Sequence, residues 1–144
     1  GSTNFDTADA AFDAAGVHLV CIELGVNDAV VSNLTASQYA GQLRRIAQEF
    51  VDRGKVVVIM PPTYASSDSI NLKTKEYLAV CQSIANGVSI YCADSQIWVQ
   101  SFEQNSNNQL FSDGVHLLTG GQQWFAGLYA DAIVNAVQSL GWFL

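Results

Sequence analysis

The chain contains two histidines, and one of them follows a carboxylate at close spacing. His116 closes the segment Asp113-Gly114-Val115-His116, which directly precedes an apolar helical pattern. An imidazole works as a general base when it is held in one tautomer, and a nearby carboxylate can do this by accepting its N–H. Asp113 and His116 could therefore carry out acid–base chemistry. The alternative is that His116 is a structural residue, which a histidine taken alone more often is.

A second group of polar residues lies near the start of the chain. Gly25-Val26-Asn27-Asp28 directly follows 17–24, a run of β-forming residues that predicts one buried strand. In open parallel sheets, ligands bind in the crevice at the carboxyl ends of the strands. Gly25, Asn27 and Asp28 are therefore candidates for the wall of an active site. The alternative is a simple turn, because Gly, Asn and Asp are common in turns.

The remaining titratable residues predict little chemistry. His18 lies near the start of its strand, at the end opposite the expected site, and is interpreted as structural. One His and one Asp fall short of a zinc site, so neither a metal nor another cofactor is expected. The 3 cysteines, Cys21, Cys81 and Cys92, form no CxxC pair and are interpreted as buried free thiols.

Length, charge and hydropathy narrow the classes of protein. A chain of 144 residues with 49% hydrophobic content is expected to form one domain with a single core. The net charge is −7 and no Lys or Arg follows Lys75, so nucleic acid is not an expected partner. No apolar run approaches the ~20 residues of a membrane span. The few basic residues, with many Ser, Asn and Gln, slightly favour an extracellular or virion-associated protein.

Apolar periodicity predicts helices that alternate with strands. The alternation of helices with continuously apolar strands predicts a parallel sheet with helices on both faces. Capping-box spacing occurs at Thr35 and Gln38 and again at Thr119 and Gln122. Strands are expected at 17–24, 56–60 and 88–92, and helices over 5–15, 36–53, 72–84, 96–102 and 119–140.

The two polar segments together resemble the SGNH (GDSL-type) hydrolases. In that family of esterases and acylhydrolases the third block reads Gly-x-Asn-Asp and the fifth reads Asp-x-x-His. Gly25 to Asp28 follows a strand and Asp113 to His116 precedes the last helix, as the two blocks do in the family. The resemblance extends from Gly1 to the last helix. It implies a three-layer α/β/α, flavodoxin-like domain over residues 1–144.

The resemblance also implies a role for each matching residue. His116 would be the general base, and Asp113 would orient it. Asn27 would donate its side-chain amide to an oxyanion hole, and Gly25 would allow close approach of the backbone. Gly1 lies where the family has its second-block glycine, whose backbone N–H is another oxyanion donor.

The family's nucleophile, a serine in a Gly-Asp-Ser block, has no counterpart in the chain. Ser2 follows a glycine but has no strand before it, so the role is not assigned to it. The expectation is an incomplete sheet, in which the chain is the C-terminal portion of the domain. The first strands and the nucleophile would come from an N-terminal fragment or a second chain. The strand at 17–24 would then expose an apolar edge that could pair with another chain.

Three functions are compatible with these observations. The first is a serine esterase that acts on a simple ester or an O-acylated glycan and takes its nucleophile from outside this chain. The isolated chain would then be inactive. The second is a non-catalytic SGNH-like module that binds a glycan or has a structural role. The third is a flavodoxin-like binding module in which the two motifs are coincidental, although no Gly-rich phosphate loop supports it.

Overall fold

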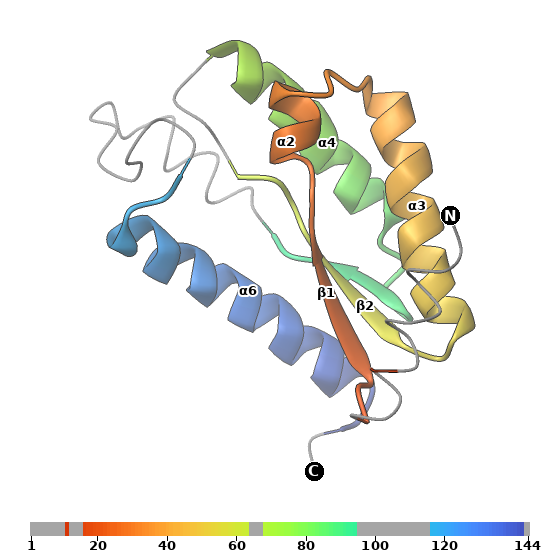
Figure 1. The fold of residues 1–144 in the computed structure, drawn as a ribbon. Helices are drawn as coiled ribbons and strands as arrows, with labels where there is room; N and C mark the ends of the chain where they lie inside the picture. The colour runs from red at the N-terminus through yellow and green to blue at the C-terminus, as the bar shows by residue number, and fades with distance from the viewer. Residues whose placement is uncertain (1–10, 12–15, 64–67, 95–115, 143–144) are drawn as a thin grey trace.

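The computed structural model describes residues 11, 16–63, 68–94 and 116–142. The helix expected at 96–102 lies outside these residues, as does the helix at 5–15 apart from Ala11. The described elements agree with the predicted alternation of strands and helices (Figure 1). In chain order they are β1 (Leu19–Glu23), α2 (Val26–Val30), α3 (Ala36–Asp52), β2 (Val56–Met60), α4 (Asp68–Ile84), β3 (Ile90–Cys92) and α6 (Thr119–Ser139).

The three strands form one parallel sheet in the order β1-β2-β3. Leu19 of β1 is paired with Val56, and Val58 of β2 is paired with Tyr91 of β3. All five residues of β2 are buried, as expected for a strand with a neighbour on each side and a helical layer on each face. The predicted parallel sheet is therefore confirmed, and β2 is its centre.

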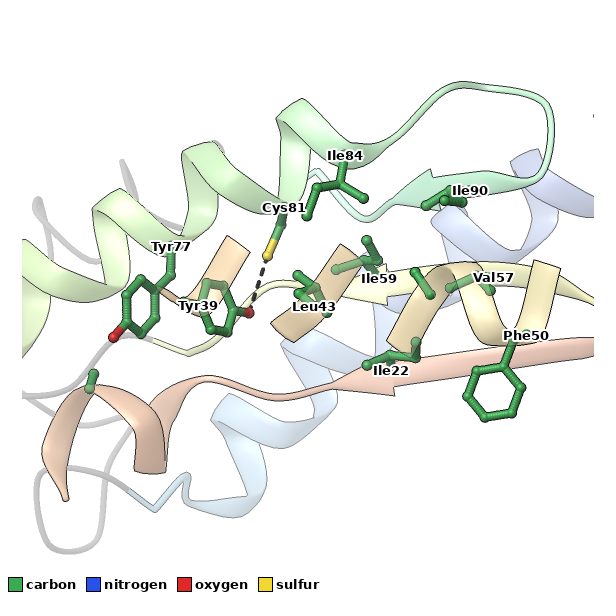
Figure 2. Packing of buried hydrophobic residues seen from close by; sticks show 12 residues of the cluster. Ile22, Tyr39, Leu43, Phe50, Val57, Ile59, Tyr77, Cys81, Ile84 and Ile90 are labelled. Carbon is green, nitrogen blue, oxygen red and sulfur yellow. Dashed lines mark hydrogen bonds between the residues drawn. The ribbon is translucent and has the colours of Figure 1, made fainter. Parts of the chain in front are cut away.

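Helices cover both faces of the sheet and make three layers. On one face α3 and α4 pack against alternate residues of the strands, among them Ile22, Val57 and Ile59 (Figure 2). On the other face α6 packs against the intervening residues, among them Val56 and Val58. Period-two alternation of the strand side chains thus divides the core into two halves. The predicted α/β/α architecture is confirmed.

One of the two predicted capping boxes forms. The Thr35 hydroxyl accepts the Gln38 backbone N–H at 3.2 Å, and the Gln38 side chain accepts the Thr35 N–H at 2.9 Å, at the start of α3. The second prediction was wrong. The N-cap of α6 is Leu118, with no side-chain hydrogen bond, and Gln122 instead donates its amide to the Leu117 carbonyl at 3.1 Å.

Two expectations about burial were also wrong. The apolar periodicity of residues 72–84 predicts Leu72 on the inner face of α4, but its side chain is 67% exposed, and the buried positions of that helix include Asn71, Thr74 and Leu78. Cys21 is exposed rather than buried. It lies on the face of β1 toward α6, and α6 contacts mainly β2 and β3.

β1 is the end strand of the sheet in the part of the chain that the structure describes. Its paired neighbour is β2, and Figure 1 shows its other long side without a described strand. Leu19 and Val20 are half-buried, whereas Cys21 and Glu23 are exposed. None of the described helices combines the length and the apolar character needed to cross a membrane.

The central strand generates a stability prediction. Val57 is 0% exposed and Val88 is 72% exposed, so the same substitution can be compared at both positions. Val57→Ala removes two buried methyl groups and leaves a cavity, and should lower the free energy of unfolding by about 2–3 kcal/mol. Val88→Ala should change it by less than about 0.5 kcal/mol. Urea denaturation measures both, and equal effects would contradict this assignment of the core.

Candidate active site

A pocket of about 380 Å³ lies at the carboxyl ends of β1 and β2. The structure brings four of the predicted site residues, Gly25, Asn27, Asp28 and His116, together on its wall. Asp113 and Gly1 lie outside the described residues. The described residues that line the pocket are Glu23, Leu24, Gly25, Val26, Asn27, Asp28, Pro62, Thr63 and His116.

Gly25 is where the chain leaves β1 and enters the pocket wall. Its φ of 127° lies in a region that side-chain-bearing residues rarely adopt. A Cβ atom at this position would lie 3.1 Å from Cβ of Pro62 and 3.1 Å from Oη of Tyr39. Both the backbone conformation and the lack of space therefore require glycine.

Asn27 lies in the first turn of the short helix α2, which was not predicted from the sequence. The turn is closed by the Ala29 N–H, which donates to the Gly25 carbonyl at 2.9 Å. The backbone carbonyl of Asn27 accepts the Val31 N–H at 2.8 Å. Its side chain is exposed and makes no hydrogen bond with another described residue. The amide is therefore available to a ligand in the pocket.

His116 reaches the same pocket from the other half of the chain. It is exposed and lies in a bend shortly before Thr119, where α6 begins. His18 lies at the opposite end of β1 and packs edge-on against Trp142, with ring centroids 6.0 Å apart. Of the two histidines, only His116 lines the pocket.

Apart from His116, the ionisable side chains among the described residues of the pocket wall are carboxylates. Glu23 and Asp28 both line it, and no Lys or Arg is among the described lining residues. The Tyr129 hydroxyl of α6 donates to Glu23 Oε1 at 3.3 Å. Burial and the Glu23 carboxylate raise the pKa of Tyr129 above its usual range, so the phenol remains a donor. Glu23 was not predicted as a pocket residue, although a charged residue at the end of an apolar strand is such a signal.

Pro62 and Thr63 form the wall that follows β2. The double proline Pro61-Pro62 directly follows the strand predicted at 56–60, and no role was predicted for Thr63. Thr63 is only 8% exposed, so the atoms packed around it restrict the movement of its side chain. The parallel pairing of Glu23 with Met60 aligns the two strand ends and places these residues beside the Gly25 turn.

None of the described thiols has the features of a catalytic nucleophile. Burial raises the pKa of Cys81 to about 11 and that of Cys92 to about 12, and partial desolvation of the more exposed Cys21 thiol raises its pKa as well. A reactive cysteine instead needs a lowered pKa, because the thiolate is the nucleophile. None of the three is among the described residues that line the pocket at the ends of β1 and β2. No group of three or more metal-ligating side chains occurs among the described residues.

Solved structures of esterases share this arrangement of strands and helices. Two mutant forms of Axe2 from Geobacillus stearothermophilus, an acetyl-xylooligosaccharide or acetylxylan esterase, are 20% and 21% identical to the chain, with TM-scores of 0.71 and 0.70. They match 89% and 83% of this chain, which spans 66% and 61% of theirs. A protein from Slackia heliotrinireducens described as a candidate SGNH hydrolase is 19% identical, with a TM-score of 0.56, and matches 80% of this chain and 65% of its own.

No protein-family model and no curated protein matches the sequence. The likeness to the solved structures is therefore one of fold: the chain has the α/β fold of the SGNH hydrolases. It spans slightly less than two thirds of the length of each of those structures. The predicted SGNH-like fold is thereby confirmed.

A side chain at Gly25 would be strained, and this can be tested by substitution. Gly25→Ala should destabilise the protein by about 1–3 kcal/mol, since the new side chain meets Pro62 and Tyr39 and the backbone conformation disfavours it. Gly41→Ala is a matched control in α3, where nothing lies within 4 Å of the added Cβ. It should stabilise the helix by about 0.5–1 kcal/mol. Thermal unfolding of the two variants gives the comparison, and a neutral Gly25→Ala would contradict this geometry.

Proposed function

We propose that this chain supplies the oxyanion-binding and general-base residues of a serine esterase. The observation that carries the proposal is the shared pocket, in which Asn27 from the β1 end and His116 from before α6 lie on one wall. An exposed amide donor and an imidazole at the carboxyl edge of a parallel sheet are two of the groups that ester hydrolysis through an acyl-enzyme requires, the third being a nucleophile. The fold shared with esterases supports the same class of reaction.

The proposed reaction has two steps of the same form. A serine hydroxyl attacks the ester carbonyl while His116 takes the hydroxyl proton, with Asp113 holding the imidazole in one tautomer. The carbonyl oxygen becomes an oxyanion that accepts hydrogen bonds from the Asn27 side-chain amide and the Gly1 backbone N–H. His116 then gives its proton to the leaving alcohol. Water attacks the acyl-serine in the same way and releases the acid.

The nucleophilic serine is proposed to come from a polypeptide segment outside this chain. The side of β1 that has no neighbour among the described strands is the proposed place for that segment, because a parallel strand paired there would end at the same edge of the sheet as Gly25. Its carboxyl end would then bring a serine beside the pocket. On this proposal residues 1–144 are the C-terminal portion of one SGNH-like domain, and the added strand completes the sheet.

A neutral ester is the proposed substrate. Glu23 and Asp28 make the described wall of the pocket acidic, so a phosphate or carboxylate on the substrate would be repelled. An acetyl group on a sugar hydroxyl carries no charge and presents a small acyl group. The names of the Axe2 structures, which specify acetylated xylan or xylooligosaccharide, support an O-acetylated glycan.

A non-catalytic module that binds a glycan is the second candidate. The observation that favours it is the absence from the sequence of a Gly-Asp-Ser block. The pocket would then bind an acylated sugar without cleaving it.

Activity on p-nitrophenyl acetate distinguishes the proposed serine esterase from the non-catalytic binding module. We expect no turnover from the 144-residue chain alone, and turnover when a segment that carries Gly-Asp-Ser is joined to it or mixed with it. In the active form His116→Ala should abolish turnover, whereas His18→Ala, at the far end of β1, should leave it unchanged. Turnover that survives His116→Ala would exclude the proposed mechanism. Failure of every such segment to produce turnover would favour the binding module.

Loss of the Asn27 amide, the proposed oxyanion donor, should lower kcat without abolishing turnover. Asn27→Ala should lower kcat by about 10²–10³-fold, because one donor to the developing negative charge is removed. The matched control is Asn135→Ala on α6, an exposed asparagine that is absent from the described wall of this pocket. Steady-state kinetics of both variants in the active form test this, and an equal effect of the two substitutions would be evidence against an oxyanion role for Asn27.

A further inference from the structure

Two tyrosines from different helices stack against each other beneath the segment that carries Asn27. Tyr39 of α3 is 2% exposed and Tyr77 of α4 is fully buried. Their ring centroids are 4.1 Å apart and the ring planes differ by 14°. Figure 2 shows the two rings side by side, with the Cys81 thiol beside the Tyr39 hydroxyl. Such a stack has little freedom to move, because each ring is fixed by the other and by the surrounding core.

The two hydroxyls bind the two ends of one segment. The Tyr39 hydroxyl donates to the Leu24 carbonyl at 2.9 Å, immediately before Gly25. The Tyr77 hydroxyl donates to the Leu34 carbonyl at 2.6 Å, after the end of α2. Between these two carbonyls lies α2 with Asn27.

The direction of each hydrogen bond follows from its acceptor. A carbonyl oxygen can only accept, so the single hydroxyl proton of Tyr39 goes to Leu24. The contact of 3.4 Å between Tyr39 Oη and Cys81 Sγ is then made by the thiol proton, which points to the phenol oxygen. Burial raises the pKa of both Tyr39 and Tyr77, with Asp28 a further cause, so both phenols keep their protons. The two hydrogen bonds therefore run in one direction: the Cys81 thiol donates to the Tyr39 hydroxyl, and that hydroxyl donates to the Leu24 carbonyl.

A side-chain hydrogen bond to α4 also restrains the segment at Asn33. Lys73 of α4 donates from Nζ to the Asn33 side-chain oxygen, next to Leu34. Within the segment, the Leu34 N–H donates to the Asp28 carbonyl at 3.1 Å. Because the Tyr77 hydroxyl restrains Leu34, this hydrogen bond also restrains the backbone of Asp28, and with it the preceding residue, Asn27.

We propose that Tyr39 and Tyr77 are positioning residues that fix the Asn27 amide in the geometry an oxyanion requires. The proposal rests on the esterase function proposed above. A donor that is already oriented stabilises developing charge without reorganisation, whereas a mobile one loses much of its effect. The two hydroxyls act on the backbone at both ends of α2, so they orient the side chain without touching a substrate.

Hydrogen exchange of the 144-residue chain tests the positioning without any enzyme activity. Tyr39→Phe and Tyr77→Phe keep the stacked rings and remove one hydroxyl each. We expect exchange at the amides of Ala29 and Leu34 to accelerate at least about tenfold more than exchange at Val57 of β2. The control is Tyr91→Phe, which removes a hydroxyl that donates to the Val88 carbonyl at 3.3 Å, and it should leave Ala29 and Leu34 unchanged. Acceleration that is equal at Val57 and Ala29 would show only a general loss of stability and would overturn the proposal.

A measurement on the unmodified chain covers the case in which a variant does not fold. The Tyr39 hydroxyl oxygen lies 3.1 Å from the position of a Cβ on Gly25, which an Hα of the glycine occupies in part. The hydroxyl proton should therefore give a nuclear Overhauser effect to the Gly25 Hα protons at low temperature. Absence of that effect, with the Tyr39 hydroxyl exchanging rapidly with water, would also overturn the proposal.

Kinetics in the active form separate catalytic positioning from a structural role. Tyr39→Phe and Tyr77→Phe should each lower kcat about tenfold with KM within about twofold, and Tyr91→Phe should change neither. A local loss of exchange protection with unchanged kcat would refute the catalytic part. If no esterase activity is found, the exchange result still decides whether the two hydroxyls fix the segment, so the two proposals fail independently.

Discussion

Parallel pairing of β1 with β2 is the constraint on which the rest of the structure depends. In the observed register Glu23 lies opposite Met60, so the two strands end at the same level of the sheet. The Gly25 turn and the segment Pro62–Thr63 leave the sheet side by side and form two walls of one pocket. A shift by one residue would turn Ile22 away from the core formed with α3 and α4, and burial of that side chain therefore holds the register.

The same pairing explains why the pocket wall combines a rigid support with an exposed amide. β2 is buried along its whole length, and the helix that precedes it carries Tyr39 into the core. The turn after β1 is bound to this core because the Leu24 carbonyl accepts a hydrogen bond from the Tyr39 hydroxyl. Gly25 is buried, whereas Asn27, only two residues beyond it, is exposed to solvent. The transition from core to solvent therefore takes place within one helical turn.

Much of the fold could be predicted because its signals are local. A run such as 56–60 is continuously apolar, and the Thr35 capping box contains all its own hydrogen-bonding groups, so neither requires knowledge of the rest of the chain. The short helix α2 was missed because its N-cap is Gly25, at φ 127° and with no capping side chain, which leaves no sequence signal for a helix start. Leu72 was misplaced because hydrophobicity alone does not determine which residues of α4 face the sheet.

The candidate site likewise has some features that could be predicted from the sequence and others that could not. Its polar residues were predictable from type and order, since an asparagine after a strand and a histidine before a helix are visible in the sequence. The hydroxyls beneath them were not. Tyr39 and Tyr77 belong to apolar helical stripes, a pattern that predicts core positions and gives no sign of a hydrogen bond. Their acceptors are backbone carbonyls, which every residue type has. Interactions with backbone acceptors are determined by the fold and leave no residue pattern.

The close approach around Gly25 has a consequence for how this protein can vary in evolution. Position 25 lies at the end of β1, position 39 in α3 and position 62 after β2. A Cβ atom at position 25 would lie 3.1 Å from Oη of Tyr39 and 3.1 Å from Cβ of Pro62. A side chain at position 25 requires a smaller residue at 62, loss of the hydroxyl at 39, or both. Among related sequences the three positions should therefore change together, and a non-glycine residue at position 25 should be accompanied by a smaller residue at 62, a residue without the phenol at 39, or both.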